Sequence, residues 1–169
     1  LPAMASAALL AELPRLRRYA RALVGDRMAA DDLVQDTLER AWSRLDRWRP
    51  GSDLRTWLFA IMHNLRIDQL RRPAVECIPI DEDAHLLPVR ASQSDRIELD
   101  NLAAALARLP EEQRAVLLLI SLEEMSYAEV AATLGIPLGT VMSRLSRGRE
   151  HLRQILAGDT ASPRLRVVR

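Results

Sequence analysis

Hydrophobic residues recur at helical spacing along most of the chain. From Pro14 to Val24 apolar positions follow one another at intervals of three and four residues, and Gly25 can end that helix. A longer pattern, from Ala30 to Leu45, predicts a second helix with one inward-facing stripe. The predicted stripe consists of Ala30, Leu33, Val34, Thr37, Leu38, Ala41, Trp42 and Leu45.

A turn precedes the third predicted helix. The residues Arg-Pro-Gly-Ser-Asp at 49–53 are typical of a turn, and an apolar helical pattern runs from Leu54 to Leu65. The end of this helix is basic, with Arg66, Arg71 and Arg72. We therefore expect residues 1–72 to form a small helical bundle.

An acidic stretch without periodicity follows. Pro73, Pro79 and Pro88 interrupt it, so a flexible acidic linker is predicted over residues 73–96. A second helical domain is predicted over residues 97–158, and a basic tail over 159–169.

Capping signals define the helices of the second domain. Apolar residues from Ile97 to Leu109 repeat helically, and Pro110 can open the next helix from its first turn. Ser126-Tyr127-Ala128-Glu129 is a capping box for a short helix that ends at Gly135, and a last helix runs from about Pro137 to Leu156. No segment alternates with period two, so the predicted fold class is all-α, with two small helical domains.

The composition argues against a membrane protein, a secreted protein and a protein with disulfide bonds. The longest apolar runs have six residues, far short of the roughly 20 that span a bilayer, so we expect no membrane insertion. The N-terminus lacks a basic region ahead of an apolar core, which favours a cytoplasmic protein. Cys77 is the only cysteine, which excludes an internal disulfide and a multi-cysteine metal site.

Basic charge is concentrated at the end of the chain. Residues 143–169 hold 7 Arg and 2 acidic residues, whereas residues 73–100 hold 2 Arg and 7 acidic residues. The short helix, the turn at Gly135 and the Arg-rich last helix resemble a helix-turn-helix, whose second helix enters the major groove. In that helix Val141, Leu145 and Leu152 form an inward stripe, which leaves Ser143, Arg144 and Arg147 for bases and phosphates. The alternative is a two-helix corner with a solvated Arg face.

Two features of the first domain suggest further contacts. Asp32, Gln35, Asp36 and Glu39 form a polar stripe along one face of the second helix, for which a solvated face is the simplest interpretation. Trp48 lies between two arginines in a loop. An aromatic in that setting suits stacking on an unpaired base, and packing against the helix end is an equal alternative.

The ordered motifs of the chain resemble bacterial RNA polymerase sigma factors of the extracytoplasmic-function (ECF) group. The first domain resembles sigma region 2 in Ala30-Asp31-Asp32-Leu33-Val34-Gln35-Asp36, Asp53-Leu54-Arg55-Thr56-Trp57-Leu58 and residues 64–72. The second resembles sigma region 4 in Leu109-Pro110-Glu111-Glu112-Gln113-Arg114, Ser126-Tyr127-Ala128-Glu129-Val130-Ala131 and residues 139–149. The resemblance implies a transcription initiation factor that binds core RNA polymerase and promoter DNA, with no enzymatic activity and no cofactor or metal.

The resemblance also implies a role for each site. The stripe Asp32, Gln35, Asp36 and Glu39 is expected to bind core polymerase. The loop from Trp48 to Asp53, Asn64 and the basic residues Arg66, Arg71 and Arg72 are expected to bind the minus-ten element, with a flipped base received near Trp48 and Asn64. The residues expected to read the minus-thirty-five element are Thr140, Met142, Ser143, Arg144, Arg147 and Arg149.

Met142 departs from the family pattern, because many relatives carry a basic residue there. Contact with a thymine methyl is expected in place of a hydrogen bond. The family also implies a protein that is a monomer when free and is held inactive by an anti-sigma factor. The linker of 24 residues spans at most about 80 Å when extended, enough for two promoter elements about 70 Å apart.

Two alternative functions explain less of the chain. An autonomous helix-turn-helix repressor or activator leaves the polar stripe and Trp48 without a role. An enzyme is disfavoured because the chain has no Gly-rich phosphate loop and no Gly-x-Ser-x-Gly or His-Glu-x-x-His motif. Asp81, Asp83 and His85 could suggest a metal site, but a solvated acidic linker is the better interpretation.

Overall fold

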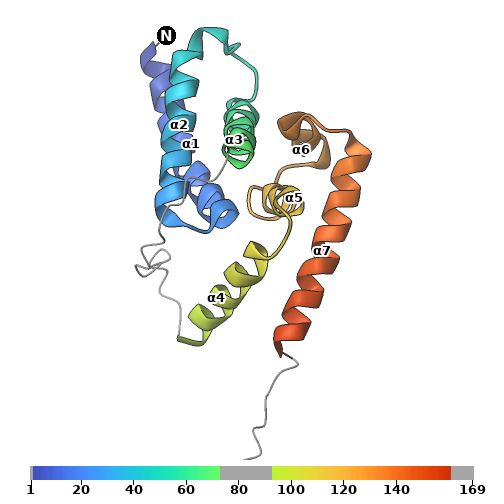
Figure 1. Ribbon diagram of the computed structural model, residues 1–169. Helices are drawn as coiled ribbons and strands as arrows, with labels where there is room; N and C mark the ends of the chain where they lie inside the picture. The colour runs from blue at the N-terminus through green and yellow to red at the C-terminus, as the bar shows by residue number, and fades with distance from the viewer. Residues whose placement is uncertain (1, 73–92, 161–169) are drawn as a thin grey trace, which may run out of the picture.

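The computed structural model describes residues 2–72 and 93–160 (Figure 1). Within these two ranges every regular element is a helix, which confirms the predicted all-α class. Most of the predicted linker, with Cys77, Asp81, Asp83 and His85, lies outside the described residues, as does nearly all of the basic tail. In the described part of the chain, no helix is both long enough and apolar enough to cross a membrane.

The first bundle consists of α1 (Pro2–Val24), α2 (Arg27–Ser43) and α3 (Leu54–Arg71), with a short 3-10 turn at Leu45–Arg47. α1 begins well before the predicted start at Pro14, because the preceding Ala- and Leu-rich residues are strong helix formers and Leu9 is buried. Gly25 follows the helix with a φ of 81°, so its role as a helix end is confirmed.

Side chains that cap helices fix where α2 and α3 begin. The carboxylate of Asp26 accepts a hydrogen bond from the amide of Ala29 at 3.0 Å, and that of Asp53 accepts one from the amide of Arg55 at 3.1 Å. The core between the helices includes an edge-to-face pair, Tyr19 and Phe59, with ring centroids 5.1 Å apart. These contacts hold α2 and α3 at fixed positions and so fix the loop between them.

The second bundle consists of α4 (Gln93–Ala107), α5 (Glu111–Ser121), α6 (Tyr127–Leu134) and α7 (Leu138–Thr160). Pro110 stands just before α5 as its N-cap, one position earlier than the predicted first turn. The apolar pattern through α4 was interpreted too broadly, since Ile97 and Leu102 are 58% and 37% exposed and burial begins only at Ala105. α4 reaches the core only at its C-terminal end, where it approaches α5.

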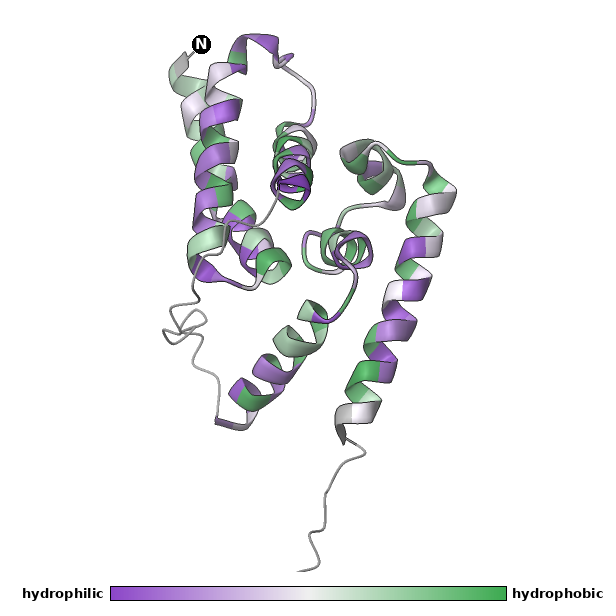
Figure 2. Cartoon of the chain, in the orientation of Figure 1, coloured by the Kyte–Doolittle hydropathy of each residue, from purple (hydrophilic) through white to green (hydrophobic). Residues whose placement is uncertain are grey.

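The two bundles pack against each other. α1 contacts α4 and α5, and α3 contacts α6 (Figure 1). One cluster of buried apolar side chains runs from Leu16 and Leu58 in the first bundle to Val116 and Val141 in the second. Hydrophilic and hydrophobic residues alternate along α7 (Figure 2), as expected for a helix with one face on that cluster and one in solvent.

Candidate nucleic-acid and protein interfaces

The polar stripe of α2 is exposed along its whole length. Asp32, Gln35, Asp36 and Glu39 all lie on the side opposite the buried Leu33 and Thr37. The amide nitrogen of Gln35 donates to a carboxylate oxygen of Glu39 at 3.3 Å. The structure thus brings the predicted residues together on one accessible face, which carries negative charge.

Trp42 belongs to this exposed face and not to the core. The prediction that it lies on the inward stripe is wrong, because its exposed fraction is 56%. Trp42 follows Gln35 by seven residues and Glu39 by three, and both spacings place it on the side of the polar stripe. A helical-wheel comparison with Gln35 would have found this aromatic residue.

The loop between α2 and α3 presents Trp48 in a half-buried position. Its backbone amide donates to the carbonyl of Leu45 at 3.2 Å, and its indole Nε1 is buried with no hydrogen-bond partner among the described residues. The ring is therefore partly covered by the end of the bundle, which agrees with the alternative interpretation that Trp48 packs against the helix end. Its remaining exposed surface leaves room for a stacked base.

Asp53 is already engaged in holding α3. Besides the amide of Arg55, its carboxylate accepts a hydrogen bond from the Thr56 hydroxyl. The Thr56 hydrogen bond is the largest cause that holds the pKa of Asp53 below its ordinary value. In this position Asp53 fixes the loop and does not extend from it as a free ligand.

The candidate DNA residues of α3 differ in accessibility. Asn64, Arg71 and Arg72 are exposed. Arg66 is only 16% exposed, because its Nε donates to Glu111 of α5 at 2.7 Å. The structure therefore leaves most of the predicted minus-ten residues accessible and places Arg66 in an ion pair between the two bundles.

A helix-turn-helix is formed by α6 and α7. The predicted capping box is confirmed: the amide of Glu129 donates to the hydroxyl of Ser126 at 3.1 Å, and the amide of Ser126 donates to the carboxylate of Glu129 at 2.6 Å. Gly135 adopts a left-handed conformation with a φ of 65°, which favours glycine. Buried Val141 and Leu145 then fix the rotation of α7.

The first turns of α7 expose some of the predicted recognition residues and cover others. Met142 is 52% exposed, and Arg147 and Arg149 are exposed. Thr140 and Ser143 are half-buried, and the Ser143 hydroxyl donates to the carbonyl of Thr140 at 3.1 Å. The accessible recognition residues in this conformation are therefore Met142 and Arg149 on one side of α7 and Arg147 on another.

Arg144 lies one turn before Arg147, on the side of α7 that contacts α5. Its side chain is 24% exposed, and its Nη2 lies 3.5 Å from a carboxylate oxygen of Glu112. It is also near His63 of α3, a half-buried imidazole whose pKa is lowered chiefly by burial and then by the positive charge of Arg144, with Glu111 opposing both. Arg144 thus occupies the contact between the bundles.

Tyr127 also belongs to this surface, although the sequence did not predict it. Tyr127, the first residue of α6, is 40% exposed and lines an open hollow beside α7. The other residues of the hollow are Met142, Leu145, Ser146, Arg149, Glu150 and Arg153. Its position directly after the capping Ser126 is the sequence signal that could have identified it, because the N-terminus of a helix attracts phosphate.

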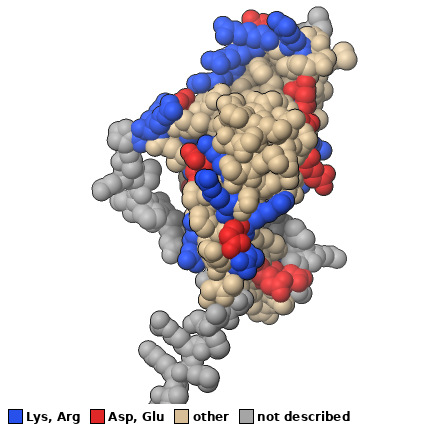
Figure 3. Space-filling model, turned by 90° about the vertical axis from the view of Figure 1, so that its right-hand side faces the viewer, with Lys and Arg blue, Asp and Glu red and all other residues tan. Residues whose placement is uncertain are grey.

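Figure 3 shows the face of the molecule on which α7 lies. Basic side chains gather at the top, at the end that carries the α2–α3 connection, and side chains of both charges surround an uncharged area below. Around that connection the exposed basic residues are Arg40, Arg44, Arg47 and Arg49. Positive charge thus surrounds Trp48, as expected for a surface that meets nucleic acid.

Comparisons with known proteins agree with this arrangement. Residues 9–63 match the family described as the Sigma2 domain of PhyR, and residues 99–152 match Sigma-70, region 4. The chain is 39% identical over 154 residues to the ECF RNA polymerase sigma factor EcfG of Rhodopseudomonas palustris, a match that covers 90% of this chain and 85% of that protein. The chain belongs to the ECF sigma factor family. As an ECF sigma factor it directs RNA polymerase to promoters, and it is not an enzyme.

Two solved structures resemble this sigma factor over most of its length. The sigma factor RpoE of Bartonella quintana, in complex with the anti-sigma factor NepR, is 35% identical with a TM-score of 0.74, and the match covers 91% of this chain and 97% of that one. CnrH, in complex with the cytosolic domain of CnrY, is 29% identical with a TM-score of 0.68, covering 91% and 88%. Family membership excludes the autonomous regulator and the enzyme as the function of this sigma factor.

Proposed function

We propose that this sigma factor binds polymerase through α2, binds the minus-ten element around the α2–α3 loop and reads the minus-thirty-five element with α7. The observation that carries the proposal is that an exposed acidic stripe and an exposed Arg-bearing recognition helix occur in the same chain. The corresponding domains are residues 1–72 and 97–158, joined by 73–96 and followed by a basic tail, 159–169.

The polymerase contact consists of Asp32, Gln35, Asp36 and Glu39, with Trp42 beside them. Carboxylates on a rigid helix steer a basic partner surface and fix its register. An exposed tryptophan adds a large apolar contact, a kind of residue that is enriched at the energetic centre of interfaces.

The minus-ten contact combines stacking, hydrogen bonding and charge. Trp48 offers a ring face to an unstacked base, and the Asn64 amide can both donate to and accept from a base edge. Asp53 supports the loop by capping α3. Arg71 and Arg72 supply positive charge for the backbone, and Arg66 joins them when it is released from Glu111.

The minus-thirty-five contact is made by the first three turns of α7. Arg147 and Arg149 are placed for phosphates or guanine edges, and Met142 for a thymine methyl. Arg144 contributes when it leaves Glu112. Thr140 and Ser143 shape the start of the helix, and Tyr127 faces the backbone beside the α6 N-terminus.

An anti-sigma factor is the proposed regulator. The similar sigma factors RpoE and CnrH are both in complexes with such proteins, which supports a partner of this class here. We assign the sigma factor to the cytoplasm, where polymerase and promoters are, and expect a monomer in the free state.

Run-off transcription tests the proposal. Purified core polymerase, with and without the sigma factor, is given a library of genomic promoter fragments. Promoter-specific transcripts that require the sigma factor are expected. Variants of the α2 stripe and of α7 should then reduce transcript yield for different reasons: loss of polymerase binding for α2, and loss of promoter discrimination for α7. Equal yields from all variants would contradict the assignment of these surfaces.

A further inference from the structure

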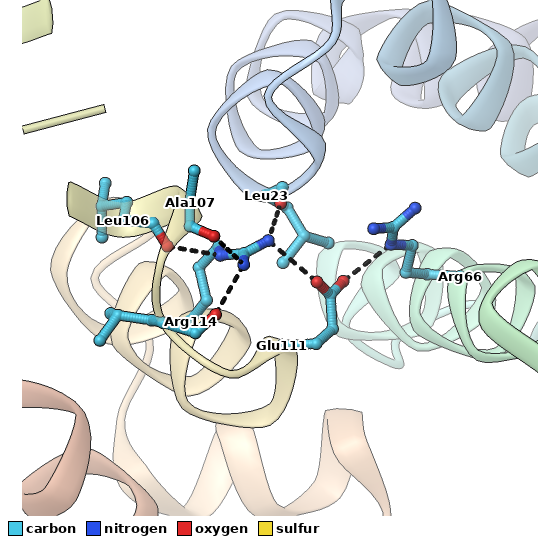
Figure 4. A network of polar contacts seen from close by, with 7 residues as sticks. Leu23, Arg66, Leu106, Ala107, Glu111 and Arg114 are labelled. Carbon is cyan, nitrogen blue, oxygen red and sulfur yellow. Dashed lines mark hydrogen bonds and ion pairs between the residues drawn. The ribbon is translucent and has the colours of Figure 1, made fainter. Parts of the chain in front are cut away.

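A single carboxylate joins the two bundles at the N-terminus of α5. Oε1 of Glu111 accepts a hydrogen bond from Nε of Arg66 in α3 at 2.7 Å, and Oε2 accepts one from Nη1 of Arg114 at 3.0 Å (Figure 4). Nη1 of Arg114 also donates to the carbonyl of Leu23, at the end of α1, at 2.7 Å. Elements of both bundles therefore converge on Glu111.

The next residue, Glu112, makes a longer and more exposed ion pair with the recognition helix, within the second bundle. The Glu112 carboxylate lies 3.5 Å from Nη2 of Arg144. Glu112 is 71% exposed, whereas Arg144 is 24% exposed and lies close to His63 of α3. Two adjacent carboxylates thus each hold one arginine, Arg66 from the proposed minus-ten surface and Arg144 from the proposed minus-thirty-five surface.

The two carboxylates and DNA compete for the same arginine side chains. The planar guanidinium fork that binds a carboxylate is the group that binds a phosphate or a guanine edge. An arginine that is held by Glu111 or Glu112 cannot offer the same donors to DNA. Promoter binding through Nε of Arg66 or Nη2 of Arg144 therefore requires the corresponding pair to break.

We propose that Glu111 and Glu112 act as internal competitors of promoter DNA: Glu111 occupies Arg66 across the contact between the two bundles, and Glu112 occupies Arg144 within the second bundle. The proposal rests on the proposed function, because it takes Arg66 and Arg144 as DNA contacts. It adds a regulatory role for two carboxylates that the proposed function leaves without one.

A second ion pair joins the two bundles on another side of α1. Nη2 of Arg18 in α1 donates to Oε1 of Glu123 at 3.1 Å, and the Glu123 side chain is fully buried. The other oxygen, Oε2, is buried and has no hydrogen-bond partner among the described residues. A buried carboxylate oxygen without a donor costs free energy, so this pair stabilises the packed state less than a fully paired carboxylate would.

The competitor can be tested in the full chain without polymerase. The probes come from a promoter that gives a run-off transcript with this sigma factor: a duplex of its minus-thirty-five element and the single strand of its minus-ten element. Fluorescence anisotropy measures the affinity of wild type, Glu111→Gln and Glu112→Gln for both. Glu98→Gln removes the same charge from an exposed carboxylate of α4 and is the matched control.

We expect each variant to raise affinity for a different probe. Glu111→Gln should raise affinity for the single strand, and Glu112→Gln should raise affinity for the duplex, each by about 1.5- to 5-fold relative to Glu98→Gln. The gain should be larger for Glu111, because its pair with Arg66 is shorter and less exposed. Circular dichroism verifies the fold of each variant, and Glu112, being on the surface, remains a valid test if Glu111→Gln is unstable.

If neither Glu111→Gln nor Glu112→Gln raises DNA affinity more than the control does, the proposal that these carboxylates compete with DNA is wrong. Gains of equal size on both probes would contradict it as well, since they would reflect net charge alone. The proposed function has a separate test, because it fails only if wild type gives no promoter-specific transcript or if Arg66→Ala and Arg144→Ala transcribe and bind DNA as wild type does.

Discussion

Nη1 of Arg114 and the backbone carbonyl of Leu23 lie 2.7 Å apart, although 91 residues separate them in the chain. The same guanidinium donates to the carbonyls of Leu106, Ala107 and Leu109, at 2.7, 3.1 and 2.7 Å. These acceptors lie where α1 and α4 end, and helix ends leave carbonyls without intrahelical partners. One buried side chain therefore satisfies the backbone of both bundles.

Arg114→Met should destabilise the fold severely. The substitution leaves several buried carbonyls and Glu111 without a donor, so we expect a loss of about 3–5 kcal/mol in the free energy of unfolding. Urea unfolding followed by circular dichroism measures it. Arg17→Met, at an exposed position of α1, should change the free energy by less than about 0.5 kcal/mol. Equal losses in the two variants would contradict the role of Arg114.

Asp53→Ala should reduce stability in a pH-dependent manner. Loss of this N-cap should cost about 0.5–2 kcal/mol at neutral pH. The hydrogen bond from Thr56 holds the pKa of Asp53 below its ordinary value in the folded state. The stabilisation is therefore complete above the ordinary carboxyl pKa and is lost as the pH falls through the lowered one. The free energy of unfolding is measured at neutral and at strongly acidic pH. Asp53→Ala should be less stable than wild type at neutral pH and equally stable at strongly acidic pH. The control within α3, Asp68→Ala, should match wild type at both.

Asp36→Arg should weaken binding to core polymerase while the protein stays folded. Reversal of a charge at a close interfacial pair costs about 2–5 kcal/mol, whereas an exposed position outside an interface changes binding by less than about 0.5 kcal/mol. Biolayer interferometry with immobilised core polymerase measures the affinity. Glu98→Arg makes the same charge change on α4 and should bind as wild type does. If Asp36→Arg also binds as wild type does, the stripe is only a solvated face.

Arg144→Ala and Arg147→Ala should reduce recognition of the upstream element. A bidentate contact with guanine predicts a loss of about 1–3 kcal/mol on the native element and little on a scrambled one. A phosphate contact predicts equal weakening on both sequences and a shallower salt dependence. Titrations of both duplexes at several salt concentrations distinguish the two roles. Unchanged affinity and salt slope in both variants would exclude these positions as contacts.

Trp48→Ala and Asn64→Ala should impair promoter melting more than promoter binding. Stacking on an aromatic ring returns about 1–3 kcal/mol per base, comparable with the cost of unstacking one. We expect nearly normal polymerase binding and closed complexes, with less open complex on duplex promoters. Permanganate reactivity of unpaired thymines measures opening, and a pre-melted bubble should restore only the melting component. Wild-type reactivity in both variants would refute the assignment.

Local sequence patterns predicted most of the helices. They could not predict which residues of different helices contact each other. The capping box at Ser126 and the left-handed Gly135 depend on neighbouring residues, so the sequence identified both. Arg66 and Arg144 were identified as basic candidates, but their pairing with Glu111 and Glu112 depends on how α5 packs against α3 and α7. Periodicity within one helix carries no information about such partners.

Two predictions about the first bundle were wrong for reasons that lie within a single helix. The first helix was predicted only from Pro14 onward, where the apolar spacing is regular, whereas α1 contains Pro14 in its interior. Trp42 was assigned to the inward stripe because it continues the three-and-one spacing, although its seven-residue spacing from Gln35 places it beside the polar stripe.

Gly148 lies where α7 packs closely against α5. A Cβ at this position would lie 3.3 Å from Cβ of Gln113, so a larger residue would require α5 or α7 to shift by a few tenths of an ångström. α7 continues as one rigid rod on both sides of that point, from Leu138 to Thr160. Thr140 lies eight helical steps before Gly148, a distance of about 12 Å, so a tilt of about 10° about this contact would move the first turn by about 2 Å. A protein that pushed on the C-terminal arm of α7 would therefore shift the DNA-reading arm by most of a hydrogen-bond length, without touching any residue that meets a base.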